Sequence, residues 1–193
     1  MNHITIQNLC KAFGEKKVLD NFSATFPVGT VSCIMAPSGA GKTTLLSIMQ
    51  GLLRPDSGSM EGIPAKMAAV FQEDRLCEDF NAVSNVRFSC GSKSHKKSKE
   101  EITACLVSLG LGDSLDKPVR SFSGGMKRRV AIARALMADY ELLFLDEPFK
   151  GLDEKLKISV AEYIKTSATG KTVIAVSHNE AEAALLGATI IKM

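Results

Sequence analysis

Several features that would mark other classes of protein are missing from the 193-residue sequence. No apolar run approaches the ~18 residues that a membrane-spanning helix needs, and the N-terminus carries no secretory signal pattern. The five cysteines are odd in number, scattered and without a C-x-x-C pair. A net charge of +3 is too small to indicate nucleic acid as a partner. These absences predict a cytosolic protein with reduced thiols, which does not cross a membrane itself but can lie against one.

Internal repeats and low-complexity linkers are also missing, and 45% hydrophobic with 23% charged residues is ordinary for a globular protein. The length suits one domain, with room for a subdomain. The most basic stretch is Lys-Ser-His-Lys-Lys-Ser-Lys at residues 93–99. We interpret it as a solvated loop or the start of a helix, and a binding role is the less favoured alternative.

One glycine-rich segment carries most of the information in the chain. An apolar, β-branched run at residues 30–35 leads into it, and a helical pattern with Leu45, Leu46 and Met49 follows. A strand that feeds a glycine-rich turn at the start of a helix is the context of a phosphate-binding loop. The loop is expected to comprise Ala36, Pro37, Ser38, Gly39, Ala40, Gly41, Lys42, Thr43 and Thr44.

The chemistry of this loop follows from its residue types. Glycines let successive amides face the phosphates, and the helix N-terminus adds positive potential. Lys42 would reach the β and γ phosphates, and the Thr43 hydroxyl would ligate Mg²⁺. Ala36 stands where the first glycine of the motif usually lies. We expect it to be tolerated, because a residue with negative φ is allowed at a strand exit.

A second motif ends an apolar run further along the chain. Residues 142–145 read Leu-Leu-Phe-Leu and are followed by Asp146 and Glu147. Ligands of open parallel sheets bind outside the carboxyl ends of the strands, so both carboxylates should emerge beside the loop. Asp146 is placed to hold Mg²⁺ and Glu147 to polarise an attacking water.

The order of patterns predicts an α/β fold with a mostly parallel sheet covered on both faces. Antiparallel strands are expected near residues 4–6 and 18–26, and a turn at 54–58. Parallel strands are expected at 67–71, 142–145, 172–176 and 188–191. Helices are expected at 124–138 and 154–167. Strand signals vanish over residues 72–122, which predicts a helical subdomain between core segments 1–71 and 123–193.

Four further motifs then fit a single family. The chain carries Phe-Ser-Gly-Gly-Met at 122–126, Gln72 after a strand, Gly-Leu-Asp at 151–153 and His178 at a strand end. In this order and spacing they resemble the signature motif, Gln loop, Asp loop and switch histidine of ATP-binding cassette (ABC) ATPases. The resemblance covers residues 13–178. It implies a P-loop NTPase fold of the ABC type that binds and hydrolyses ATP with Mg²⁺.

The resemblance also implies a role for each matching residue. Two cassettes would pack head to tail as a homodimer, and each ATP would contact one protomer's loop and the partner's signature residues Ser123, Gly124, Gly125 and Met126. Glu147 would be the catalytic base, and His178 would orient the water and γ-phosphate. Gln72 would contact Mg²⁺ or that water, and Asp153 would contribute to the nucleotide site. Phe13 matches the adenine-stacking aromatic, and its alternative is a core residue between two strands.

Finer likeness points to the ATPase subunits of nitrate, sulfonate and taurine importers. It rests on Phe-Gln-Glu-Asp-Arg-Leu at 71–76 and Leu-Asp-Glu-Pro-Phe at 145–149, although Cys77-Glu-Asp replaces the usual Pro-Trp. The implied protein lies on the inner face of the cell membrane, with transmembrane permease subunits as partners, a substrate-binding protein as an indirect partner and no nucleic acid. The alternatives are a soluble ABC ATPase in repair or translation and a cassette that binds ATP without hydrolysis.

Residues 72–85 are the expected permease contact, with Leu76 and Phe80 exposed. The alternative is that both pack into the subdomain core.

Overall fold

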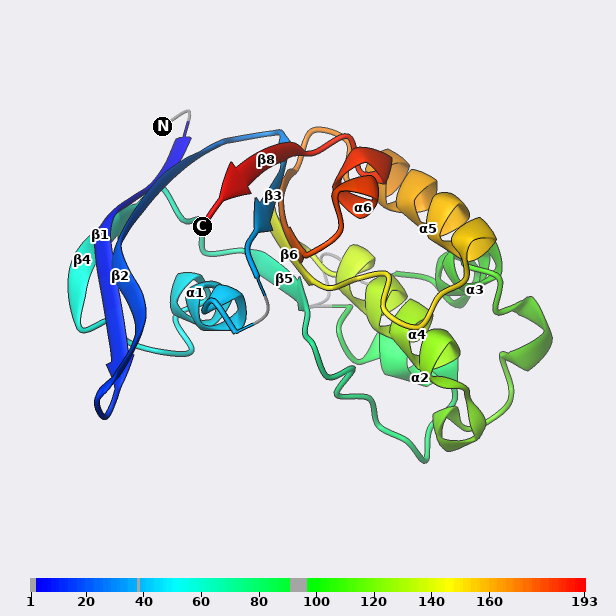
Figure 1. Ribbon diagram of the computed structural model, residues 1–193. Coiled ribbons are helices and arrows are strands. Elements are labelled where there is room, and N and C mark those ends of the chain that lie inside the picture. Colours follow the sequence, from blue (N-terminus) through cyan, green and yellow to red (C-terminus); the bar gives the residue numbers. More distant parts are fainter. Residues whose placement is uncertain (1–2, 38, 91–96) are drawn as a thin grey trace.

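The computed structural model describes residues 3–37, 39–90 and 97–193. Figure 1 shows its layers, with a curved antiparallel sheet on one side, a parallel sheet in the middle and most helices on the far side. Helix α1 (Lys42–Met49) lies between the two sheets and packs its apolar residues against both. The predicted α/β architecture is confirmed.

The antiparallel sheet has the strand order β2-β1-β4. Strands β1 (His3–Phe13) and β2 (Lys16–Pro27) are longer than the sequence pattern indicated. Irregular pairing interrupts the pattern, because Asn8 and Asn21 adopt left-handed backbone conformations near register shifts. Strand β4 (Ser57–Glu61) was missed, since the polar Ser-Gly-Ser-Met-Glu sequence carries no strand signal and only the turn before it was expected. Strand β4 forms because its backbone pairs with β1, an interaction between distant segments that the local sequence does not indicate.

The parallel sheet has the order β5-β6-β7-β3-β8. Its strands are β3 (Val31–Met35), β5 (Met67–Val70), β6 (Leu142–Asp146), β7 (Thr172–Ser177) and β8 (Thr189–Lys192). Strands β6 and β7 are buried along their whole length, which explains their continuous apolar runs. The predicted parallel strands are therefore confirmed, including the final one.

Alternate side chains of these strands enter two separate cores. Phe144 and Ile34 face α1 and the antiparallel sheet, whereas Leu145 and Cys33 face the helices of the other layer. Because both faces of the sheet are covered by packed side chains, the sheet is a rigid support for the loops at its carboxyl end.

Helices cover the second face. They are α2 (Ala82–Arg87), α3 (Lys99–Ser108), α4 (Gly124–Leu136), α5 (Glu154–Ser167) and α6 (Glu180–Leu185), with 3-10 turns η2 (Gly112–Ser114) and η3 (Val119–Ser121). In the described part of residues 72–122 the only β pairing is an isolated Asn81–Pro118 bridge. The helical character expected for this segment is confirmed, and its independence as a subdomain stays a prediction.

The basic stretch leads into a helix. Residues 93–96 lie outside the described part, but α3 begins at Lys99 with a reciprocal cap between Ser98 and Glu101. Lys97 pairs with Glu101 at 3.3 Å. All five cysteines are free thiols. Across the described ranges, no helix combines the length and apolar character that spanning a membrane requires.

Candidate active site

A cavity of about 420 Å³ opens at the carboxyl end of the parallel sheet, between the β1–β2 hairpin and the start of α1. Strand β6 ends in this cavity with Asp146. It is lined by Phe13, Lys16, Val18, Gly39, Gly41, Lys42, Thr43, Thr44, Gln72, Asp146 and Glu147. Lys16 and Val18 were missed at the sequence level, although their place in the hairpin after Phe13 offered a signal. Ser38 lies outside the described residues.

The start of α1 leaves backbone donors available to a ligand. Gly41 precedes the helix with φ of 93° and provides no side-chain cap. The amides of the first turn therefore lack the side-chain acceptor that most helices provide. Gly41 also lies close to β2, because a Cβ there would be 2.8 Å from the Val18 carbonyl oxygen. A glycine is required here both for the positive φ and for this approach.

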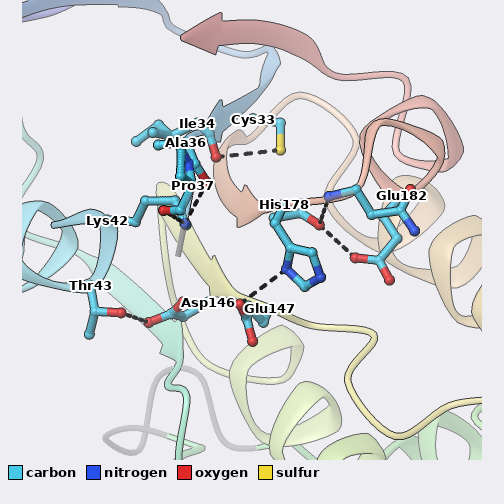
Figure 2. A network of polar contacts seen from close by, with 12 residues as sticks. Cys33, Ile34, Ala36, Pro37, Lys42, Thr43, Asp146, Glu147, His178 and Glu182 are labelled. Carbon is cyan, nitrogen blue, oxygen red and sulfur yellow. Dashed lines mark hydrogen bonds and ion pairs between the residues drawn. The ribbon is translucent and has the colours of Figure 1, made fainter. Parts of the chain in front are cut away.

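Lys42 lies at the edge of the same cavity and is nearly buried. Its ammonium donates to the carbonyl oxygens of Ala36 and Pro37, at 2.7 and 2.8 Å (Figure 2). These bonds keep the charge beside the loop amides, where an anionic phosphate would be met by both. Ala36 itself is outside the left-handed region, which among described non-glycine residues holds Asn8, Asn21, Arg75 and Glu147.

Thr43 and Asp146 form a pair of oxygen donors on the cavity floor. The Thr43 hydroxyl donates to Asp146 Oδ2 at 3.0 Å, and Asp146 is only 5% exposed. Burial raises the pKa of the Asp146 carboxyl; the Thr43 hydrogen bond opposes this rise and the Glu147 charge adds to it. A hydroxyl and a carboxylate beside Gln72 make a hard-oxygen set that fits Mg²⁺, whose charge would favour the ionised form.

Glu147 and His178 meet at the ends of neighbouring strands β6 and β7. Glu147 Oε1 lies 3.4 Å from His178 Nδ1, and the imidazole side chain is 68% exposed (Figure 2). Glu147 holds a positive φ of 47°, and its amide donates to the Val176 carbonyl oxygen at 3.0 Å. A non-glycine residue in this conformation costs free energy and is common at functional sites. The main chain thus fixes where this carboxylate points.

Phe13 is not a core residue. Its side chain ends β1 at the cavity wall and is 52% exposed, so the alternative in which it packs between two strands is wrong. Lys11 Nζ lies 5.6 Å from the ring centroid and pairs with Asp56 at 2.6 Å. The exposed ring is available for stacking with a base.

Gln72 lines the cavity, and a residue that the sequence analysis missed holds its main chain. Arg128 of α4 is 3% exposed and donates to the carbonyl oxygens of Phe71 and Gln72, at 2.6 and 2.9 Å. It also pairs with Asp74 at 3.1 Å. The helix that begins at the signature motif is thereby tied to the segment that carries Gln72.

The signature residues and Asp153 do not line this cavity. Ser123 is the exposed N-cap of α4, and its hydroxyl oxygen accepts from the Met126 amide at 3.3 Å. Because a hydroxyl also carries one donor, Ser123 can still donate outward. Asp153 caps α5 by accepting from the Leu156 amide at 2.9 Å. These residues form a second polar surface, separate from the cavity of their own chain.

The two signature glycines differ in their surroundings, which leads to a prediction. A Cβ on Gly125 would lie 2.6 Å from the Gly151 carbonyl oxygen, whereas a Cβ on Gly124 would meet nothing within 4 Å. Gly125→Ala is therefore expected to destabilise the fold by about 1–3 kcal/mol through backbone overpacking. Gly124→Ala is the matched control and should cost less than about 0.5 kcal/mol. Urea unfolding of the two variants would measure the difference, and equal stability would contradict the packing argument.

The fold and the cavity define a class of protein. A glycine-rich loop between β3 and α1, a buried Asp at the end of β6 and a neighbouring Glu–His pair match the motifs of a P-loop ATPase cassette. The family model described as "ABC transporter" matches residues 19–150. The chain belongs to the ABC transporter family of ATP-binding proteins, and these proteins are ATPases.

Relatives include the taurine import ATP-binding protein TauB of Ruegeria pomeroyi, which is 35% identical over 100% of this chain and 78% of the relative. The aliphatic sulfonates import ATP-binding protein SsuB of Corynebacterium glutamicum is 34% identical over 94% of this chain and 76% of the relative. A solved dimeric structure of a bacterial ABC transporter cassette superposes with a TM-score of 0.84 at 27% identity, covering 98% of this chain and 94% of that one. The resemblance found in the sequence to taurine and sulfonate import cassettes is confirmed.

Proposed function

We propose that the chain is the motor subunit of a membrane importer, which couples hydrolysis of MgATP at a head-to-tail homodimer interface to movement of the permease. One observation carries the proposal: Lys42, the Thr43–Asp146 pair and Glu147 line one cavity at the carboxyl end of the sheet, and His178 lies 3.4 Å from Glu147. The importer relatives support the direction of transport. No described feature favours a role in repair or translation.

Each residue has a defined task in this proposal. Phe13 stacks on adenine, while the loop amides and Lys42 bind the phosphates. Thr43, Asp146 and Gln72 hold Mg²⁺, which when bound neutralises phosphate charge. Glu147 accepts a proton from the attacking water, and His178 orients that water and the γ-phosphate.

The head-to-tail arrangement is supported by the second polar surface. The Ser123 hydroxyl and the exposed start of α4 do not line the cavity of their own chain, so a partner's γ-phosphate is a suitable acceptor. Asp153 lies on the same surface, at the start of α5. Stabilisation of the transition state then comes from the partner protomer, as with an arginine finger in trans.

The permease is proposed to bind the exposed part of residues 72–85. Phe80 is 51% exposed and stacks edge-to-face with the exposed Phe88 at 5.2 Å. Leu76 differs from the expectation, because it is half-buried against the core. Asn85, at the end of the range, is buried and bonds to the Cys77 backbone. Leu76 packs against the hydrophobic core beside the helices, and the Asn85 side chain hydrogen-bonds to the amide and carbonyl groups of Cys77. An exposed aromatic pair near the ion pairs Glu78–Lys127 and Asp79–Arg120 suits an amphipathic helix that projects from a permease. The whole subunit would then be peripheral on the inner membrane face.

Phe80→Asp is expected to abolish co-purification with the permease while the ATPase activity of the purified subunit stays within about twofold of wild type. A charge placed in an apolar contact must be desolvated on binding, which weakens the contact, and Phe80 does not line the cavity. The measurements are pull-down with the membrane subunits and phosphate release. Val28→Asp, at a position of similar exposure between β2 and β3, is the matched control and should still bind. Retained assembly of the Phe80 variant would refute this surface.

A further inference from the structure

The loop that carries His178 is anchored by hydrogen bonds among Ser177, Asn179 and Glu182. Ser177, the last residue of β7, is only 3% exposed. Its hydroxyl donates to Glu182 Oε2 at 2.6 Å and accepts from the Asn179 amide at 3.1 Å. Ser177 is therefore joined directly to the Glu182 carboxylate, and Asn179 is joined to it through the Ser177 hydroxyl.

Glu182 is itself fixed from the other side. Its Oε1 pairs at 3.2 Å with Lys157 Nζ, and the two side chains are 13% and 16% exposed. Lys157 belongs to α5, which begins at Asp153 on the signature side of the molecule, and it also pairs with Glu154 at 3.0 Å. Figure 2 shows the Glu182 carboxylate beside His178, on the side away from Glu147.

We infer that Ser177 and Glu182 are positioning residues for His178, held in place by Lys157. The imidazole is largely exposed, and its one described contact, at 3.4 Å, is with Glu147. Apart from that contact, the position of the ring depends on where its main chain is held, and the hydrogen bond from the Asn179 amide to the Ser177 hydroxyl restrains that main chain across residue 178. Short hydrogen bonds to a largely buried carboxylate are strong and hold such geometry. The inference rests on the proposed role of His178 in hydrolysis.

The test is Ser177→Ala, which removes the hydroxyl that links Asn179 to Glu182. We expect kcat for ATP hydrolysis to fall roughly tenfold, the size of a lost buried hydrogen bond, with KM for ATP unchanged. The imidazole NMR signal of His178 should shift, because the ring changes its surroundings. The chain has three histidines, so the signal is assigned by its loss in His178→Ala. Ser177→Thr keeps the hydroxyl and should restore both readouts.

Glu182→Leu removes the acceptor and should reproduce the effect of Ser177→Ala. Ser159→Ala is the matched control and should change neither readout. Among the described residues, the Ser159 hydroxyl bonds only to the Leu156 carbonyl oxygen of the same helix, at 3.1 Å. The inference is overturned if kcat falls while the His178 signal stays in place, or if neither readout changes. It is also overturned if KM rises and thermal stability falls while the His178 signal stays in place. The NMR signal does not require turnover. A wild-type protein that fails to hydrolyse ATP would therefore refute the proposed function separately.

Discussion

Glu147→Gln is expected to lower kcat by about 10²–10⁴-fold while ATP affinity stays near the wild-type value. The carboxamide has the shape of the carboxylate but cannot accept the proton of the attacking water. The main chain at Glu147 is fixed by the Val176 carbonyl bond and the left-handed conformation, neither of which depends on the side-chain charge. Single-turnover phosphate release and equilibrium binding of a fluorescent ATP analogue would measure the two quantities.

The same variant should accumulate ATP-bound dimer, because the bound nucleotide is no longer removed. Size-exclusion chromatography with MgATP would show this. Lys42→Ala is the contrasting control: it removes the ammonium beside the loop and should weaken nucleotide binding strongly, with no trapped dimer. Turnover of Glu147→Gln near the wild-type rate would show that another group is the base.

Ser123→Arg is expected to abolish hydrolysis while the ATP affinity of the isolated monomer changes less than about twofold. Ser123 does not line the cavity of its own chain, so its loss cannot affect binding there. In the proposed dimer the arginine would occupy the partner's γ-phosphate position and prevent closure. Monomer affinity by titration calorimetry and turnover at high protein concentration are the two measurements.

Loss of the α4 cap by itself costs about 0.5–2 kcal/mol, so Ser123→Gly, which costs only a few tenths, separates cap loss from the bulky charge. Ser108→Arg places the same side chain at the exposed end of α3 and should leave turnover unchanged. If the Ser123 variant lost monomer affinity in proportion to its turnover, the site would be built from one chain.

Short-range sequence determined the parts of this protein that depend on local chemistry. Gly41 supplies the left-handed conformation of the loop and Lys42 supplies its charge, and only particular residue types can do either. Continuous apolar runs determined β6 and β7, since a strand covered on both faces needs no alternation. The order of the motifs was sufficient for the family, which the comparisons then confirmed.

Tertiary structure alone decided features that depend on residues distant in the chain. The polar strand β4 exists because β1 offers it backbone partners. Phe13 is exposed because the hairpin that carries it extends beyond the core. The sequence shows only an aromatic residue between two strand patterns, which fits either a buried or an exposed side chain. Arg128 reaches carbonyl groups 56 and 57 residues earlier, and Ser177, Glu182 and Lys157 meet only when β7, α6 and α5 pack together. The physical reason is common to all of them: sequence patterns report what a segment buries, whereas the partner of a buried polar group is chosen by the packing of the whole chain.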